Sequence, residues 1–376
     1  MSEQNHRQLD LGLRPPGPIT CGVAGLKLTA RERDRLAHPA IGGVILFKRN
    51  FADPDQLRML VESIRTARDG PLVISVDHEG GRVQRFRQGF TAVPAMRLLG
   101  LVYDVDRVAA CGVARALGTL MALELARCGV DHSYTPVLDL DYGASAIIGD
   151  RAFHGDPNAV AVLAGALIDG LQSAGMAGCG KHFPGHGAVR ADSHEELPDD
   201  PRPLAELERD MAPYRLLASG PGARLAAVMP AHVRFSAVDQ QPAGVSPYWL
   251  AEILRGSLGF DGAIISDDLA MGATAAMGGP IAAGGAALDA GADVLLSCND
   301  PGITEALLAM AMDHPRTFAR ESINRRLALL MDQQRLAAAI NERSVADRRA
   351  DLSASLAPWR SLERAADVTA PAVGEP

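Results

Sequence analysis

Charged and histidine side chains stand at the ends of three short apolar runs in this sequence. In chain order they are Asp77, His78 and Glu79; Lys181, His182 and His186; and Asp267 and Asp268. Carboxylates, imidazoles and amines transfer protons, attack electrophilic carbon and bind hydroxyl groups. Each of them alone has a structural explanation, such as a helix cap or an ion pair, but burying several charges together is costly. Their convergence in one place would therefore favour a functional site.

The elements that would position these side chains are eight short runs rich in Val and Ile. They are 19–24, 41–47, 72–77, 130–135, 177–183, 225–232, 262–268 and 293–298. Continuous apolar runs of this length are typical of parallel strands covered on both faces. Between them, apolar residues recur at three- and four-residue intervals over 54–68, 106–128, 158–174 and 204–217, which predicts amphipathic helices. Asp53 and Asp156, each followed by proline, are the expected N-caps of two of these helices.

Eight strands alternating with helices predict an α/β protein with a single-domain (β/α)₈ TIM barrel, and a chain of 376 residues is long enough for one. A doubly wound open sheet is the alternative, but the glycines after the first strand do not form GxGxxG and no P-loop occurs. We expect an N-terminal extension over 1–18, the catalytic barrel over 19–340, and a C-terminal helix with a frayed tail over 341–376. Reactive groups of such barrels lie at the carboxyl ends of the strands, where the charged residues occur here.

The composition argues against several classes of protein. Lys and Arg total 37 and Asp and Glu total 45, a formal net charge of −8, and no long basic run offers a nucleic-acid-binding surface. No stretch approaches the roughly 18 apolar residues of a membrane helix, and residues 1–20 lack the apolar core of a signal peptide. We therefore expect a soluble, cytoplasmic protein with neither nucleic-acid nor membrane partners. The cysteines show no CxxC pair or zinc spacing and are expected to be reduced; they are Cys21, Cys111, Cys128, Cys179 and Cys298.

Five motifs, VDHEGGRVQRF, IGDRAF, KHFPGHG, DSHEELP and SDDLAM, resemble those of the glycoside hydrolase family 3 β-N-acetylglucosaminidases of bacterial peptidoglycan recycling. They occur in the family's order and at similar spacings from about Ile19 to Asn299. The length also resembles that of the single-domain bacterial enzymes, whereas many family 3 β-glucosidases add a second domain that contributes a carboxylate. One departure is His78, where the usual residue is Gln. We expect His78 to face the neighbouring strand loop without altering the reaction.

The resemblance implies that Asp267 is the catalytic nucleophile, because the family motif places this residue directly after the serine. A carboxylate at a strand end can attack the anomeric carbon and form a covalent glycosyl-enzyme. Its neighbour Asp268 is the alternative.

The resemblance also implies that His194 of DSHEELP is the acid and base, in place of the usual second carboxylate. Unperturbed imidazole has a pKa of about 6.5, which suits donation and return of a proton at neutral pH. Asp192 would orient the imidazole as the third member of a triad does. The alternatives are Glu195 as a conventional carboxylic acid, or a capping box of Ser193 and Glu196 that leaves His194 exposed.

The same resemblance implies that a set of charged and polar side chains binds the sugar hydroxyls through bidentate hydrogen-bond donors and acceptors. They are Asp77, Arg85, Arg151, Lys181 and His182. His186 is either a site residue or part of a loop hinge. Gly185 and Gly187 would let the loop carrying His194 move, because glycine tolerates positive φ.

The implied activity is that of a cytoplasmic retaining exo-β-N-acetylglucosaminidase that removes terminal non-reducing N-acetylglucosamine from muropeptides, a small carbohydrate partner, without metal or cofactor. Related alternatives are a family 3 glycosidase of other sugar specificity and a glycoside phosphorylase. A metal-dependent barrel hydrolase is a further alternative, but the first strand ends CGVAG rather than HxH. Its ligand set would come from His182, His186, His194, His232, Asp77 and Asp267. A catalytically silent sugar-binding protein is the alternative outside the enzymes.

Overall fold

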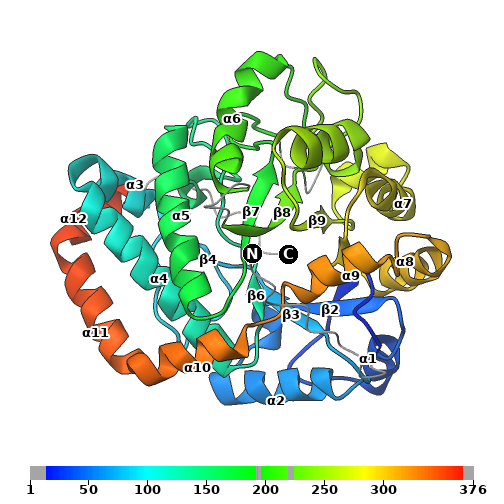
Figure 1. The fold of residues 1–376 in the computed structure, drawn as a ribbon, viewed down its shortest axis with the longest axis horizontal. Coiled ribbons are helices and arrows are strands. Elements are labelled where there is room, and N and C mark those ends of the chain that lie inside the picture. The colour runs from blue at the N-terminus through cyan, green and yellow to red at the C-terminus, as the bar shows by residue number, and fades with distance from the viewer. Residues whose placement is uncertain (1–13, 192, 194–195, 219–223, 367–376) are drawn as a thin grey trace, which may run out of the picture.

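An eight-stranded sheet in which every strand pairing is parallel lies at the centre of the molecule (Figure 1). The computed structural model describes residues 14–191, 193, 196–218 and 224–366. The strand order is β6-β3-β2-β1-β10-β9-β8-β7. The strands are β1 (Ile19–Gly22), β2 (Ile41–Leu46), β3 (Val73–Val76), β6 (His132–Ser133), β7 (Gly178–Phe183), β8 (Leu225–Pro230), β9 (Ala263–Asp268) and β10 (Val294–Ser297). Each lies within one of the eight predicted runs, so the predicted strands are confirmed.

The sheet curves until its two edge strands, β6 and β7, almost close it into a barrel. They meet through a single parallel bridge between His132 and Ala177. Beyond β6 the chain turns but stays beside β7, where the amide of Cys179 donates to the carbonyl of Thr135 at 2.8 Å. The predicted strand over 130–135 is longer than the regular strand, which ends at Ser133. Of the expected (β/α)₈ TIM barrel, the α/β class and a nearly closed, eight-stranded parallel sheet are confirmed, and the open doubly wound alternative is wrong.

Helices surround the sheet and create two apolar layers, one inside the barrel and one between strands and helices (Figure 1). Asp53 and Asp156 cap α2 and α5 by accepting backbone amides, as predicted. The helices before the C-terminal segment are α1 (Ala30–Leu36), α2 (Pro54–Arg65), α3 (Met96–Val105), α4 (Arg107–Arg127), α5 (Pro157–Ser173), α6 (Leu204–Leu217), the π-helix Tyr248–Ser257, α7 (Pro280–Ala290) and α8 (Pro301–Asp313). The four predicted helical stretches coincide with α2, α4, α5 and α6.

Helix α4 is long and apolar enough to be a candidate membrane span by length and composition. However, 67% of its most apolar window is buried inside the protein, where α4 packs against α3, α5 and α11 (Val345–Leu356). A core helix of a folded domain has these properties, so α4 is weak evidence for a membrane segment.

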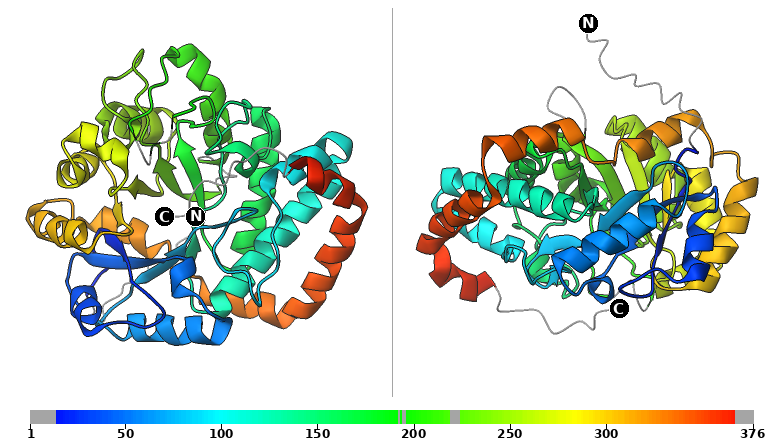
Figure 2. Two further views of the ribbon diagram at one scale, coloured as in Figure 1. Left: turned by 180° about the vertical axis from the view of Figure 1, so that it is seen from behind. Right: turned by 90° about the horizontal axis from the view of Figure 1, so that it is seen from below.

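The C-terminal segment covers one end and one side of the barrel. Helices α9 (Arg320–Leu327) and α10 (Gln333–Glu342) lie along one end, as Figure 2 shows from below, and Leu329 between them joins the apolar cluster inside the barrel. Helices α11 and α12 (Arg360–Ala366) then run beside α4 and α3. The expected boundary at residue 340 falls inside α10, and residues 367–376 of the segment expected to form a helix and a frayed tail lie outside the described residues.

A short antiparallel hairpin, absent from the predicted elements, follows β3. It pairs β4 (His78–Gly80) with β5 (Val83–Gln84). Gly80, the last residue of β4, and Gly81, in the turn that follows, have φ of 119° and 53°, values that favour glycine. The hairpin was not predicted because its strands are too short to show a periodic pattern.

Candidate active site

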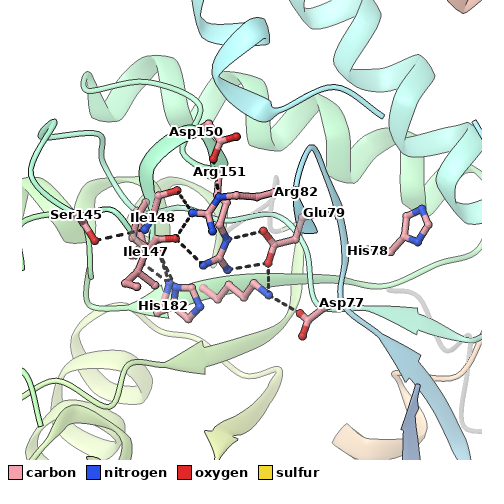
Figure 3. A network of polar contacts seen from close by, with 12 residues as sticks. Asp77, His78, Glu79, Arg82, Ser145, Ile147, Ile148, Asp150, Arg151 and His182 are labelled. Carbon is pink, nitrogen blue, oxygen red and sulfur yellow. Dashed lines mark hydrogen bonds and ion pairs between the residues drawn. The ribbon is translucent and has the colours of Figure 1, made fainter. Parts of the chain in front are cut away.

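Side chains from three segments form a buried ion-pair cluster at the carboxyl ends of β3 and β7 (Figure 3). Lys181 Nζ lies 2.6 Å from Asp77 Oδ1 and 2.6 Å from Glu79 Oε1. The side chains of Lys181 and Glu79 are 3% and 2% exposed, whereas that of Asp77 is 22% exposed. Asp77 is therefore the most exposed of these three side chains and lies at the mouth of the barrel. The predicted convergence of Asp77 and Lys181 is confirmed.

Arg151 completes the cluster from the 3-10 helix Gly149–Arg151. Its Nε and Nη2 each donate to one carboxylate oxygen of Glu79 at 2.8 Å, a bidentate pair. Arg82, on the hairpin, positions this segment by pairing with Asp150 at 2.9 Å and donating to the carbonyl of Ile147 at 2.5 Å. Glu79 and Arg82 had no assigned role in the sequence analysis, although both lie in VDHEGGRVQRF.

Neighbouring charges hold Glu79, Lys181 and Arg151 in their charged forms. Burial alone would raise the pKa of Glu79, but the charges of Arg151 and Lys181 outweigh it and hold that pKa well below its usual range. Burial likewise opposes the charge on Lys181, but Asp77 and Glu79 raise its pKa above the ordinary value. Glu79 also raises the pKa of Arg151 against the effect of burial. Groups held charged in this way suit binding of hydroxyls rather than proton transfer.

A second polar network centres on Asp139, which the sequence analysis missed. Its Oδ2 lies 2.7 Å from His182 Nδ1, and its oxygens also accept the backbone amides of His182 and His186. Burial would raise the pKa of Asp139, but His182 and His186 lower it below the ordinary value. Asp139 therefore fixes His182, whose ring Figure 3 shows beside the Lys181 cluster. Its signal is the run VLDLD directly after the fourth predicted strand, where charges would reach the barrel mouth.

His186 and its flanking glycines form a packed corner. Neither Gly185 nor Gly187 is among the glycines at positive φ. A Cβ on Gly187 would lie 1.9 Å from the carbonyl oxygen of Leu140, and one on Gly185 would meet Asp210 at 2.7 Å. The expectation that these glycines supply positive φ for a hinge is wrong, because close approach of neighbouring segments requires them. His186 itself is buried, which lowers its pKa.

Asp267 and Asp268 end β9 at the same mouth but have different surroundings. Asp268 Oδ1 accepts the backbone amides of Ala270 and Cys298, both at 3.1 Å. Burial, together with the charge of Asp267, raises the pKa of Asp268. Asp267 Oδ1 accepts the amide of Asp268 at 2.8 Å, and Ser266 Oγ donates to the Asp267 carbonyl. Asp268 is thus committed to holding the ends of β9 and β10 together.

Arg85 directly follows β5, and its guanidinium lies near Phe47, the residue after β2, which is the strand next to β3. Its guanidinium carbon is 5.9 Å from the centroid of the Phe47 ring, and Leu46 pairs with Val76 in the strand register. Phe47 therefore neighbours Asp77 at the mouth, so Arg85 lies on the same side of the barrel as the Lys181 cluster.

His78, the first residue of the hairpin, turns away from the cluster, as Figure 3 shows. It is 1% exposed, and its ring packs against Phe86 and Phe90 with centroids 5.9 and 5.7 Å away. Burial, assisted by Arg87 and Arg85, lowers its pKa to about 3. The expectation that this side chain faces the neighbouring strand loop is wrong, because it lies in an aromatic cluster and stays neutral.

The predicted acid/base residues Asp192 and His194, and the alternative Glu195, lie outside the described residues. Ser193 between them is described and buried. Its Oγ is 3.4 Å from His186 Nε2, and its carbonyl accepts the amide of Ala273 at 3.2 Å. Ser193 thus lies between the loop after β7 and the turn after β9, close to two of the predicted site segments.

The part of the chain that the structure describes holds no group of three or more His, Cys, Asp or Glu arranged to bind a metal ion. The five cysteines are free, as expected, with Cys111 half-buried and the others buried.

Comparison with known proteins identifies the family. The model of the glycosyl hydrolase family 3 N-terminal domain matches residues 7–327. A β-hexosaminidase of Chromobacterium violaceum is 48% identical over 365 residues, covering 96% of this chain and 99% of the relative. A β-hexosaminidase of Bordetella avium is 56% identical over 298 residues, covering 79% of this chain and 84% of the relative.

A similar solved structure is NagZ of Neisseria gonorrhoeae in complex with N-trifluoroacetyl-D-glucosamine. It is 44% identical, with a TM-score of 0.82 and coverage of 91% of this chain and 98% of that chain. The match of the family model over most of the chain, together with these relatives, shows that the protein belongs to glycosyl hydrolase family 3.

Proposed function

We propose that the protein is a retaining exo-β-N-acetylglucosaminidase that removes terminal non-reducing N-acetylglucosamine from β-linked muropeptides. The observation that carries this proposal is the charged cluster of Asp77, Glu79, Lys181 and Arg151 at the barrel mouth of a family 3 chain. The similarity to β-hexosaminidases, and to a NagZ solved with an N-acylated glucosamine analogue, supports the choice of sugar. The nearly closed sheet supports a single (β/α)₈ barrel as the catalytic unit.

Sugar binding is assigned to Asp77, Arg85, Arg151, Lys181 and His182. Asp77 offers a charged acceptor at the edge of the cluster, while Lys181 and Arg151 hold it and Glu79 in place. Charge-assisted hydrogen bonds to hydroxyls compete well with water when both charge and geometry are fixed in advance. The Asp139 contact fixes the His182 ring in the same manner.

Asp267 is assigned as the nucleophile. One of its carboxylate oxygens bonds to the anomeric carbon while the bond from that carbon to the leaving oxygen breaks, which gives a covalent glycosyl-enzyme. Water then attacks the same carbon and releases Asp267. Asp268 Oδ1 accepts the backbone amides of Ala270 and Cys298, and burial raises the pKa of this carboxyl group, both of which favour Asp267 as the attacking carboxylate.

His194 is assigned as the acid and base, oriented by Asp192. It donates a proton to the leaving oxygen in the first step and accepts one from the attacking water in the second. No metal or organic cofactor has a role in these steps. The proposed location is the cytoplasm, where muropeptide fragments would be the small-molecule substrate.

Hydrolysis of chromogenic glycosides tests the proposed activity. The purified protein is expected to release nitrophenol from 4-nitrophenyl N-acetyl-β-D-glucosaminide much faster than from the β-D-glucoside, and proton NMR should detect the β-anomer first. Preference for the glucoside would assign another specificity within the family. Accumulation of N-acetylglucosamine 1-phosphate in phosphate buffer would identify a phosphorylase instead.

Leaving groups of different acidity test the acid/base assignment. His194→Ala should slow cleavage of a β-linked disaccharide far more than cleavage of a dinitrophenyl glycoside, because an activated phenolate departs without proton donation. Azide should restore part of the turnover of the activated substrate by attacking the intermediate without base assistance. If Glu195→Ala shows this selectivity and His194→Ala slows both substrates equally, the carboxylate carries the proton.

A further inference from the structure

The loop after β5 is held from outside the barrel by a carboxylate on α4. Glu124 Oε2 accepts the backbone amide of Thr91 at 2.7 Å, and Glu124 Oε1 accepts the Thr91 hydroxyl at 2.6 Å. The Glu124 side chain is 5% exposed, so water competes little for these bonds. Thr91 is therefore fixed to the longest helix of the fold.

An arginine from the C-terminal segment completes this anchor. Arg349 on α11 donates through Nε to Glu124 Oε1 at 2.6 Å and through Nη2 to the carbonyl of Gly89 at 2.7 Å. Its guanidinium thus contacts both the helix carboxylate and the loop. Three segments far apart in the sequence meet at this point: the loop after β5, α4 and α11.

The anchored loop leads directly to the proposed sugar-binding arginine. Gln84, in β5, donates through Nε2 to the carbonyl of Thr91 at 2.9 Å and accepts the amide of Val93 at 3.0 Å. The amide of Gly81, in the hairpin turn, donates to the Val93 carbonyl at 2.9 Å. A shift of Thr91 therefore moves Gln84 and, with it, the next residue, Arg85.

We propose that Arg349 and Glu124 are positioning residues for substrate binding, through which the C-terminal helix α11 sets the position of the hairpin that carries Arg85. This inference rests on the proposed function, because it takes Arg85 as a sugar ligand. Hydrogen bonds at a binding site lose strength when a donor moves by a fraction of an ångström, so a distant anchor acts on affinity. Neither residue touches the sugar or the reacting atoms.

The attachment of α11 itself does not depend on Arg349. Leu352, on the same helix, is 2% exposed and belongs to the main apolar core. The preceding residue offers a matched control: Arg348 donates to the carbonyl of Ala339 at 3.2 Å and to Glu342 at 3.3 Å, both in α10. Arg348 therefore has the same chemistry on the same helix without a contact to the loop.

The test compares Arg349→Ala with Arg348→Ala in the full-length protein, using 4-nitrophenyl N-acetyl-β-D-glucosaminide. Arg349→Ala should raise KM about three- to tenfold with kcat changed less than about twofold, the size expected for coupling between separated sites. Product inhibition by N-acetylglucosamine should weaken by the same factor. Arg348→Ala should leave both values unchanged, and Arg349→Lys should recover part of the affinity because it retains the charge.

Hydrogen exchange provides a readout that does not require activity. In Arg349→Ala, amides of the loop 86–93 should exchange faster while those of β2, β3 and β7 keep their protection. If Arg349→Ala fails to fold, Thr91→Val removes only the hydroxyl bond to Glu124 and should show the same changes to a smaller extent.

A lowered melting temperature with unchanged KM and unchanged exchange in the loop would overturn the inference and leave Arg349 a structural contact. A wild-type protein that cleaves no N-acetyl-β-glucosaminide would instead contradict the proposed function. In that case accelerated loop exchange in Arg349→Ala would still support the anchor, and unchanged exchange would overturn it, so the two failures are distinguishable.

Discussion

The two ends of the barrel both contain buried charged clusters, but they satisfy those charges in different ways. At the mouth, Glu79 and Lys181 are paired side chain to side chain, with Asp77 at the exposed edge. At the opposite end, where the strands begin, Asp293 Oδ2 accepts Arg255 Nη2 and the backbone amide of Ile264, both at 3.0 Å. The cluster at the mouth leaves a charged group, Asp77, partly exposed to solvent. At the opposite end, the carboxylate of Asp293 is fully buried and bonds to neighbouring parts of the fold.

The start of β6 repeats the second arrangement. Asp131 Oδ2 accepts Arg65 Nη2 at 2.8 Å and the amide of Ile74, on the neighbouring strand, at 2.9 Å. Asp131 and Asp293 are therefore clamps between adjacent strands. Burial of a charged group does not by itself indicate function; the strand end at which it lies and the partner that satisfies it are the informative features.

The largest difference between the two ends should come from the proposed nucleophile. Asp267→Asn keeps the side-chain shape but removes the negative charge that attacks the anomeric carbon, so kcat should fall by about three or more orders of magnitude. The melting temperature should stay close to that of the wild type. Steady-state kinetics with 4-nitrophenyl N-acetyl-β-D-glucosaminide and a thermal melt measure both. Covalent sugar found on Asp268 by mass spectrometry would reassign the nucleophile.

At the other end, Asp293→Asn should cost stability and leave catalysis intact. The substitution leaves Arg255, whose side chain is 19% exposed, without its carboxylate partner, and breaking a largely buried ion pair costs about 3 kcal/mol of unfolding free energy. Urea denaturation measures the loss, and kcat per folded molecule should remain that of the wild type. The control is Asp261→Asn, whose side chain is 91% exposed beside Arg325 and whose loss should cost less than about 1 kcal/mol. A fall in kcat with normal stability would show that Asp293 influences the proposed catalytic residues at the mouth and would contradict a purely structural role.

Removing single members of the mouth should weaken binding more than folding. Asp77→Ala and Arg85→Ala each delete one proposed charged hydrogen bond to the sugar, worth about 1.5–3 kcal/mol, or about ten- to a hundredfold in KM. Asp77→Ala also leaves Lys181 paired with Glu79 alone, so a small drop in melting temperature is expected for this variant. Collapse of thermal stability at unchanged KM would make these residues structural, like those at the opposite end.

The sequence predicted the strands because each is a continuous apolar run, and it placed the cluster residues because motifs at strand ends are local. It did not predict the pairing of Glu79 with Arg151, which are 72 residues apart, or the role of Asp139. Those contacts depend on how the irregular chain after β6 lies against β7, a tertiary arrangement without a local pattern. The turning of His78 into the aromatic cluster was missed for a different reason: alternation along a strand decides which way each side chain points, but the hairpin strand was too short to be predicted.

The smallest expected effect concerns that last residue and the pH dependence of stability. His78 has a pKa of about 3 in the folded protein, against about 6.5 when unfolded. Below about pH 6.5 His78 binds a proton in the unfolded chain but not in the folded protein. The contribution of His78 to the free energy of unfolding is therefore complete above about pH 6.5 and is lost as the pH falls towards 3. At pH 5.5 the loss is about 1.4 kcal/mol.

His78→Phe keeps a ring beside Phe86 and Phe90 but cannot titrate. Urea denaturation from pH 7.5 to 4.5 should therefore show parallel curves of unfolding free energy for variant and wild type above pH 7. Below pH 6.5 the unfolding free energy of the variant should fall less steeply, because about one proton fewer is taken up on unfolding. Burial lowers the pKa of His132 to about 4, so His132 also contributes to the fall in unfolding free energy at low pH, and it does so equally in both proteins. Because the His78 ring turns away from the sugar-binding cluster, KM at pH 7.5 should stay within about twofold of the wild type, unlike that of Asp77→Ala. Equal slopes in the two proteins would mean that His78 binds a proton as readily in the folded protein as in the unfolded chain, which would contradict the lowered pKa of the buried ring.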